Sequence, residues 1–147
     1  MNIFLPFISK ASNPTTDFVN LIANDPRQKR VLKHSEGLTL AAQSKVALMI
    51  EHNIFDHVVA GIYPNQLARV FVELPDYYAI LGNNIESLVM GSKDVNLMFE
   101  ALANSPSHAK HLFGLTPFFA EQTHIGIGYS EGHNNYWWSV YIAKIAY

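Results

Sequence analysis

No cysteine occurs among the 147 residues, and charged residues account for only 15% of them. The missing cysteine excludes thiol catalysis and cysteine-based zinc sites, but it leaves the compartment open, because disulfide-free exported proteins exist. Ten basic and twelve acidic residues give a formal net charge of -2 without an extended basic run, so the charge pattern of a nucleic-acid-binding protein is missing. No apolar run reaches about 20 residues, the length of a membrane-spanning helix. We therefore predict no nucleic-acid partner and no transmembrane segment.

Apolar residues make up 49% of the sequence, which excludes a disordered chain and supplies enough side chains for one hydrophobic core. We predict an N-terminal extension at residues 1–14 and a single domain at 15–147. The first ten residues, M-N-I-F-L-P-F-I-S-K, contain a short apolar run with no basic residue before it. This run is shorter than the core of a signal peptide. From these residues alone we expect either that a leader has been removed or that the protein stays inside the cell.

The first half of the sequence carries helical patterns. Thr15 or Thr16 is a suitable N-cap for D-F-V-N-L-I-A, a short helix that ends near Pro26. Thr39 is a suitable N-cap for a second helix of about three turns with an apolar stripe. That predicted stripe consists of Leu40, Ala47, Ile50 and neighbours at three- and four-residue spacings. A further short helix is predicted at P-N-Q-L-A-R, inside a structured loop.

Two more helices are predicted before the last third of the chain. The segment K-D-V-N-L-M-F-E-A-L-A after Ser92 has apolar residues at helical spacing. Ser105 and Pro106 then suit the N-cap and the first position of another short helix. His108 would lie in the first turn, where the positive end of the helix dipole disfavours protonation of the imidazole. We therefore expect His108 to be neutral and able to bind a metal or accept a hydrogen bond.

The last third changes to the two-residue period of strands. H-I-G-I-G-Y at 124–129 and Y-W-W-S-V-Y-I-A-K-I at 136–145 alternate in side-chain type, and S-E-G-H-N-N joins them. This pattern predicts an antiparallel hairpin. Gly126 and Gly128 would weaken a strand unless another element packs closely on that face. We therefore expect a helix or an aromatic ring to lie over these two glycines.

Two histidines give the strongest indication of a site. His57 ends N-I-F-D-H, His108 lies in S-P-S-H, and G-N-N-I-E-S at 82–87 lies between them. Two neutral imidazoles with a carboxylate nearby can form a polar ligand cleft or a metal site. Four other histidines are interpreted as surface or helix-end residues: His52, His111, His124 and His133.

The motifs occur in the order Asn20 near the start of the first helix, G-L-T-L, F-D-H, G-N-N-I, S-P-S-H, I-G-I-G-Y and Y-W-W-S-V. In this order they resemble the CAP superfamily, also called SCP-like, of cysteine-rich secretory proteins, antigen 5 and plant pathogenesis-related proteins. The resemblance covers residues 15–147, and S-P-S-H without cysteine is similar to the bacterial branch. It implies an α+β fold, a three-layer α-β-α sandwich with a small, mainly antiparallel sheet and a C-terminal hairpin. It also implies a secreted or periplasmic protein with a central cleft of two histidines and up to two glutamates.

Under this resemblance, His57 and His108 occupy the positions of the two cleft histidines, and Asn83 stands where the family has a glutamate. Asparagine offers a carbonyl acceptor but no charge, which weakens attraction for a cation and removes a general base from that position. Glu86 and Glu100 are the candidate replacements for the missing carboxylate. The two histidines are the candidate ligands of a divalent metal such as zinc.

Aromatic residues extend the candidate ligand site. Tyr77 and Tyr78 lie in the loop P-D-Y-Y, where they are candidates for the rim of the cleft. Trp137 and Trp138 point to opposite faces of their strand, so at most one can face a ligand if the other is in the core. Core packing is the preferred interpretation of both.

Three classes of function fit these observations, and whether the chain is an enzyme stays open. We prefer a non-catalytic, exported binding module for a small molecule, lipid, glycan or peptide. The alternative is a metal-dependent hydrolase, such as a peptidase, in which the two histidines hold zinc and a nearby glutamate is the base. The third is an interaction domain that binds through surface loops. Serine catalysis is disfavoured because no G-x-S-x-G motif is present.

Overall fold

The centre of the computed structural model, which describes residues 13–146, is a four-stranded sheet of mixed direction. The strand order is β1-β3-β4-β2; β1 pairs with β3 in parallel, and the other two pairings are antiparallel. Residues 1–12 and 147 lie outside the described part, and with them most of the predicted N-terminal extension. The strands are β1 Lys33–His34, β2 Glu86–Met90, β3 His124–Gly132 and β4 Asn135–Ala143.

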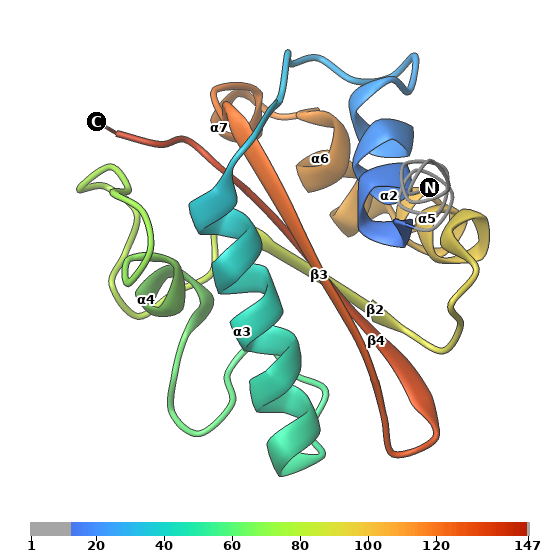
Figure 1. Cartoon of the computed structure of the whole chain (residues 1–147). Helices are drawn as coiled ribbons and strands as arrows, with labels where there is room; N and C mark the ends of the chain where they lie inside the picture. Colours follow the sequence, from blue (N-terminus) through green and yellow to red (C-terminus); the bar gives the residue numbers. More distant parts are fainter. Residues whose placement is uncertain (1–12, 147) are drawn as a thin grey trace, which may run out of the picture.

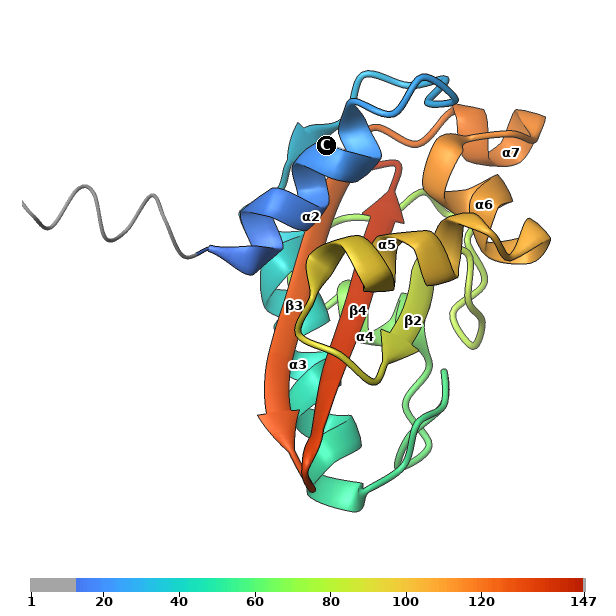
Figure 2. The same cartoon turned by 90° about the vertical axis from the view of Figure 1, so that its right-hand side faces the viewer.

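Helices cover both faces of the sheet and make three layers (Figure 1, Figure 2). α2, α5 and α6 pack on one face, while α3 and α4 pack on the other. The predicted α+β sandwich is therefore confirmed. No helix within residues 13–146 has the length and apolar character needed to cross a membrane. The helices are α2 Pro14–Ala23, α3 Glu36–His52, α4 Pro64–Ala68, α5 Val95–Ala103, α6 Pro106–Phe113 and α7 Pro117–Ala120.

β3 and β4 form the predicted C-terminal hairpin. His133 and Asn134 join them with positive φ angles of 53° and 57°, the backbone conformation of a two-residue type I′ turn. The predicted alternation along β4 is also confirmed, because Trp138 packs in the cluster of α2, α5 and α6, while Trp137 packs in a cluster with α3. Both indoles are buried in the core, so neither is open to a ligand.

The long helix α3 begins one turn earlier than predicted. The hydroxyl of Ser35, not that of Thr39, caps α3. In the same way, the side chain of Asn13, and not that of Thr15 or Thr16, caps α2. The predicted apolar stripe is wrong, because Leu40 is half exposed. Sequence reasoning missed the true face because it includes Lys45, a residue type that is almost never fully buried without a partner. The buried residues of α3 are Leu38, Ala41, Ala42, Lys45, Val46 and Met49.

The two glycines of β3 allow α3 to approach the sheet backbone. A Cβ atom added at Gly126 would lie 2.3 Å from the backbone nitrogen of Thr39, and one at Gly128 would lie 2.5 Å from the carbonyl carbon of Ala42. Both distances are shorter than van der Waals contact. The expectation that a helix lies over these glycines is therefore confirmed, and no side chain larger than hydrogen fits there without displacing α3.

Gly126→Ala is therefore expected to lower the free energy of unfolding by about 1–3 kcal/mol, the usual cost of overpacking a core. Urea denaturation measures this loss. Ser130→Ala is the matched control, because Ser130 lies on the same strand four residues further on and already carries a Cβ atom. Its effect should stay within about 0.5 kcal/mol, and an equally small effect at Gly126 would contradict the close approach of α3.

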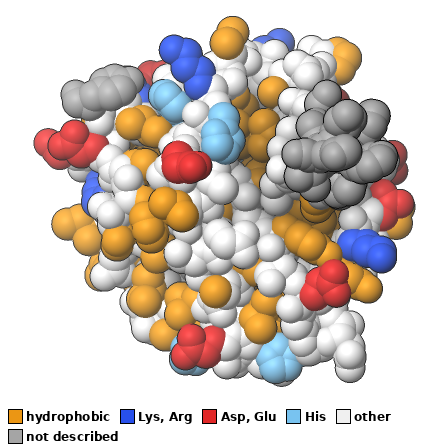
Figure 3. Space-filling model, viewed as in Figure 1, with side chains coloured by type: hydrophobic (Ala, Val, Ile, Leu, Met, Phe, Trp, Pro, Cys, Tyr) orange, Lys and Arg blue, Asp and Glu red, His pale blue; other side chains and the backbone are white. Residues whose placement is uncertain are grey.

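The segment after α4 places apolar side chains on the surface. Val70, Phe71, Ile80 and Leu81 are exposed, and Figure 3 shows hydrophobic side chains on the side of the molecule where α4 lies. The guanidinium group of Arg69 donates hydrogen bonds to backbone carbonyl groups of this segment. The loop is thus tied to α4, which fixes the direction in which the chain enters β2.

Candidate functional site

His57 lies in the loop that follows α3 and is held there by that helix and by β2. The ammonium group of Lys45 on α3 donates a hydrogen bond to the carbonyl oxygen of His57. Nδ1 of His57 lies 2.7 Å from Oε1 of Glu86, the first residue of β2. A nitrogen this close to a carboxylate oxygen carries the proton and donates it. His57 is therefore oriented through Nδ1, and its Nε2 has no hydrogen-bond partner among the described residues.

His108 lies in the first turn of α6, as predicted from Ser105 and Pro106. The hydroxyl of Ser105 does not cap the helix; it lies 2.8 Å from Nδ1 of His108 instead. Burial of the ring is the main cause that lowers the pKa of His108, and the nearby ring of His57 lowers it further. The neutral form expected from the helix dipole is thus favoured mostly by burial.

His57 and His108 line the same cleft, which has a volume of about 180 Å³. The two residues come from separate elements on either side of β2, so only the tertiary fold brings them together. Most of the lining residues carry a hydroxyl, amide, carboxylate or imidazole group, and Ile85 and Phe119 add apolar surface. The other residues of the wall are Asn83, Asn84, Ile85, Glu86, Ser87, Ser107, His111 and Phe119.

Glu86 is fully buried, with a side chain 0% exposed, and all its contacts serve to fix the site. Its carboxylate accepts hydrogen bonds from His57 and, at 2.6 Å, from the hydroxyl of Tyr141. Lys45, only 1% exposed, lies 3.3 Å from both carboxylate oxygens and neutralises the charge. Burial and the Glu86 charge raise the pKa of Tyr141 well above its usual value, which keeps its hydroxyl protonated as a donor.

Asn83 has a structural role at the start of β2. Its side-chain oxygen accepts hydrogen bonds from the backbone nitrogens of Ile85 and Glu86, and its amide nitrogen donates to the carbonyl oxygen of Glu86. The same nitrogen lies 3.2 Å from Nδ1 of His57, but that atom already donates its proton to Glu86. Asn83 therefore positions Glu86, the carboxylate that orients His57.

His111 is buried, so it is not a surface residue, although it does lie in the last turn of α6, as its interpretation as a helix-end residue allowed. It is 4% exposed and lines the cleft floor beside His108, three residues earlier on the same face of α6. Its Nε2 donates to the carbonyl oxygen of Ile142 at 3.2 Å, so its Nδ1 accepts from the hydroxyl of Ser87 at 2.7 Å. Burial lowers the pKa of His111 to about 3. The three-residue spacing from His108 was the signal that could have identified it.

Three other candidates lie away from the cleft. Tyr77 is exposed and its hydroxyl donates to Glu121, also exposed. Tyr78 is buried, and its hydroxyl oxygen accepts hydrogen bonds from the side-chain amide of Gln122 and the backbone nitrogen of Lys144. Neither tyrosine lines the cleft, because the loop turns them toward Phe118. Glu100 is exposed on α5 and does not line the cleft either.

The side chains at the cleft do not fit a resident zinc ion. Zinc in proteins takes three or four protein ligands, whereas the two unpaired Nε2 atoms of His57 and His108 supply two. Both oxygens of Glu86 are already bonded within the buried network. Within residues 13–146, no group of three His, Cys, Asp or Glu side chains is placed to hold a metal ion.

Comparison with known proteins shows the fold. No family model and no curated protein matches the sequence. An outer surface protein from Borrelia burgdorferi has a TM-score of 0.66 at 19% identity, over 97% of this chain and 96% of its own. An extracellular protein containing a SCP domain, from Bacillus anthracis, has a TM-score of 0.61 at 14% identity. The match covers 89% of this chain and 40% of that protein. Venom allergen-like protein 4 from Schistosoma mansoni has a TM-score of 0.57 at 13% identity, over 92% of this chain and 91% of its own. The chain therefore has the fold of the SCP domain, as its resemblance to the CAP superfamily implied.

Proposed function

We propose that the chain is an exported, non-catalytic binding module whose cleft between His57 and His108 holds a polar group of a glycan or peptide ligand. The observation that carries this proposal is the pair of imidazoles oriented through Nδ1, by Glu86 and Ser105 respectively. Each ring leaves Nε2 unpaired among residues 13–146. Nε2 of His57 accepts a hydrogen bond because its Nδ1 donates to Glu86, whereas Nε2 of His108 accepts or donates according to the direction of its bond with Ser105. The pair therefore suits hydroxyl or amide groups, which both donate and accept.

The size and polarity of the cleft favour a glycan or peptide over a lipid. A volume of about 180 Å³ is below the roughly 300 Å³ at which pockets for drug-sized molecules begin. It has room for one polar group of a longer ligand. Asn83, Ser87 and Ser107 add amide and hydroxyl groups to its wall, whereas an acyl chain would require an apolar one.

The same geometry favours binding over hydrolysis. A hydrolase needs a nucleophile, or a metal-bound water, within hydrogen-bond reach of its base. The hydroxyl of Ser87 is bonded to His111, and the hydroxyl of Ser105, which is bonded to His108, does not line the cleft. The proposed metal-dependent alternative lacks a third protein ligand and a free carboxylate. Two rigid imidazoles without these partners are suited to recognising a ligand.

Export is supported by the kind of protein that shares this fold. Two of the similar structures are described as an outer surface protein and as an extracellular protein. The proposed ligand would accordingly be an extracellular or cell-surface glycan or peptide. The absence of cysteine is compatible with this location.

Ligand retention tests the proposed function. Small molecules extracted from the purified protein are identified by mass spectrometry, and we expect a glycan or peptide. Retention by His57→Ala and by His108→Ala should fall about tenfold, the effect of losing one good hydrogen bond. His52→Ala is the matched control, because His52 is an exposed histidine at the end of α3. A clean extract, or equal retention by all variants, would contradict binding in the cleft.

Zinc titration separates the hydrolase alternative. A ligand that binds the folded state raises the melting temperature. If zinc raised the melting temperature of the wild type, and His57→Ala and His108→Ala both abolished the rise, the metal-dependent hydrolase would replace the binding module as the better proposal. We expect no such rise.

A further inference from the structure

The outer edge of β3 leaves one residue unpaired between β1 and the side chain of Gln43. Strand residues two apart direct their backbone N–H and C=O groups to the same side, so Ile125, Ile127 and Tyr129 face this edge together. The carbonyl oxygen of Ile125 accepts a hydrogen bond from the backbone nitrogen of Ser35, the N-cap of α3. The backbone nitrogen and oxygen of Tyr129 are bonded to the side-chain amide of Gln43, at 3.1 Å each. Within residues 13–146, the backbone groups of Ile127 have no such partner.

The unpaired groups of Ile127 lie in the wall of a cavity and not on the open surface. Ile127 is only 2% exposed, and it lines a cavity of about 290 Å³ between α2 and the start of α3. Buried backbone N–H and C=O groups are almost always paired in native proteins. A donor and an acceptor that face a cavity together are therefore available to a ligand that enters it.

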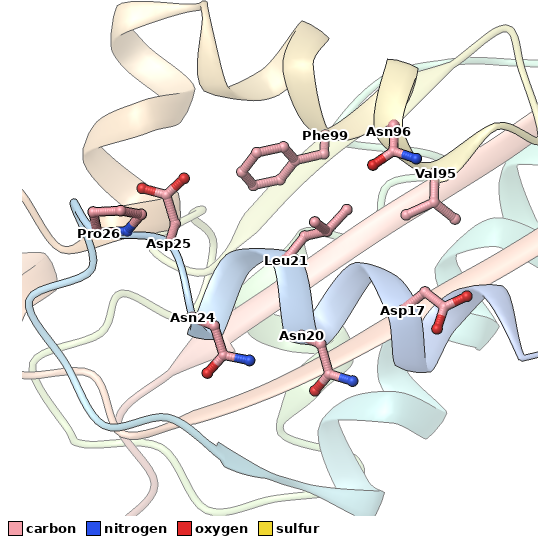
Figure 4. Close-up of a pocket in the computed structure, with 9 residues that line it drawn as sticks. All are labelled: Asp17, Asn20, Leu21, Asn24, Asp25, Pro26, Val95, Asn96 and Phe99. Carbon is pink, nitrogen blue, oxygen red and sulfur yellow. The ribbon is translucent and has the colours of Figure 1, made fainter. Parts of the chain in front are cut away.

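This cavity is separate from the cleft of His57 and His108, with which it shares no lining residue. Asn20 on α2 belongs to its wall, and Figure 4 shows the Asn20 side chain on the side of the helix that points away from Phe99. The remaining wall residues come from α2, β1 and α3. They are Thr15, Thr16, Val19, His34 and Thr39.

The wall favours an uncharged ligand. No Asp, Glu, Lys or Arg side chain lines the cavity in the described part of the chain. The hydroxyl of Thr39 already donates to the carbonyl oxygen of Ser35 and lies 3.0 Å from Nε2 of His34. Val19 and Ile127 add apolar surface. The strongest free hydrogen-bonding pair is thus the backbone of Ile127, and the rest of the wall suits small, uncharged side chains.

We infer that the cavity beside Ile127 binds an extended, uncharged peptide segment of a partner protein, which adds to the edge of β3. Main-chain hydrogen bonds to a free strand edge are a general mode of peptide recognition. The amide of Gln43 already makes this kind of pairing with Tyr129 on the same edge. A peptide beside Ile127 would take the place that the chain leaves when it turns from β1 into α3.

The two groups of Ile127 select a peptide over an acetylated sugar. In a trans secondary amide the N–H and C=O point in opposite directions, so one acetamido group cannot bond to both. An extended peptide can, because its successive amides direct an N–H and a C=O to the same edge. A volume of about 290 Å³ is close to the lower limit of small-molecule sites, roughly 300 Å³. The cavity therefore holds a short stretch of a longer peptide.

The test is a titration of the full chain, followed by ¹H–¹⁵N NMR, with three uncharged pentapeptides. Their sequence is acetyl-A-T-V-T-A-amide, with alanine or threonine in place of the central valine in the second and third. At least one should shift the amide signals of residues 15–20 and 125–129 in a saturable way. It should also slow hydrogen exchange of the Ile127 amide at least about tenfold. Exchange at Tyr129, which is already paired with Gln43, should not change.

Two further ligands test the main-chain pairing. A pentapeptide N-methylated at two consecutive central residues lacks N–H donors on both of its edges, so its affinity should be at least about tenfold weaker. Neutral chitotetraose, which carries one acetamido group on each sugar, should leave the cavity signals unchanged.

Thr16→Trp should abolish peptide binding, because the indole of an exposed wall residue would fill the cavity. Asp17→Trp is the matched control, since Asp17 is the next exposed residue of α2 and does not line this cavity. It should leave the affinity unchanged.

The inference is overturned if none of the three pentapeptides shifts the cavity signals, or if the N-methylated peptide binds as well as its parent. Equal binding by the two tryptophan variants, or binding of chitotetraose in this cavity, would overturn it as well. So would an Ile127 amide that exchanges as slowly before peptide is added as the amide of Gly128, which is paired with β4. The chain itself would then fill the site.

Discussion

Lys45→Met is expected to lower the free energy of unfolding by about 3–5 kcal/mol, the cost of leaving a buried charge without its partner. Lys45 and Glu86 are 1% and 0% exposed, and their charges lie 3.3 Å apart. Removing the ammonium group leaves the Glu86 carboxylate in the core with only neutral donors, including Tyr141. Urea denaturation at neutral pH measures the loss.

Lys144→Met is the control for this prediction. Lys144 pairs with Glu121 at 3.7 Å, but the two side chains are 41% and 61% exposed. An exposed pair contributes at most about 1 kcal/mol, so the two lysine variants should differ severalfold. Equal effects would show that the Lys45 pair is hydrated and does not lie in a low-dielectric core.

The double variant Lys45→Met, Glu86→Gln distinguishes the lost charge balance from lost packing. With both charges removed, much of the stability lost in Lys45→Met should return, because neither group then pays for an unpaired charge. Burial lowers the pKa of Lys45 more than the attraction of Glu86 raises it. The attraction between the two charges therefore does little more than offset the cost of removing them from water. If the double variant were less stable than Lys45→Met, the carboxylate would be stabilising without its partner.

The parts of the fold that follow local rules could be predicted from the sequence. Alternation along β4 and the glycines at Gly126 and Gly128 identified the hairpin and the close helix above it. Ser105 and Pro106 placed His108 in the first turn of α6. These features depend on neighbours within a few residues, where spacing and turn chemistry decide the structure.

Features that depend on distant contacts were missed. β2 is a short strand whose partner, β4, follows about fifty residues later, and nothing in its composition distinguishes it from a loop. Lys45 was not among the residues expected on the buried face of its helix, because its partner, Glu86, is far along the chain. The role of Glu86 at His57 depends on the fold for the same reason: it was one of two candidate carboxylates, and only the position of β2 separates it from Glu100.

Acid is expected to destabilise the protein through His111. Its pKa is near 6.5 in the unfolded chain and about 3 in the folded one, so between these values only the unfolded state binds the proton. Stability is therefore fully present above pH 6.5 and falls as the pH decreases, by about 1.4 kcal/mol per unit. The loss at pH 4 should reach about 3 kcal/mol from this residue. The lowered pKa values of His108 and His124 act in the same direction.

Comparison of wild type with His111→Gln in urea at pH 7, 5 and 4 isolates this effect from the titration of carboxylates, which both proteins share. The variant should be less stable at pH 7, because His111 bridges Ser87 and Ile142, but its stability should fall less steeply toward pH 4. His52→Gln, at an exposed histidine of α3, should keep the wild-type slope. Parallel pH profiles for wild type and His111→Gln would mean that the imidazole of His111 can be protonated in the folded protein. In that case the protonated ring would form part of the cleft wall beside His108, and ligand binding there should weaken over the same pH range.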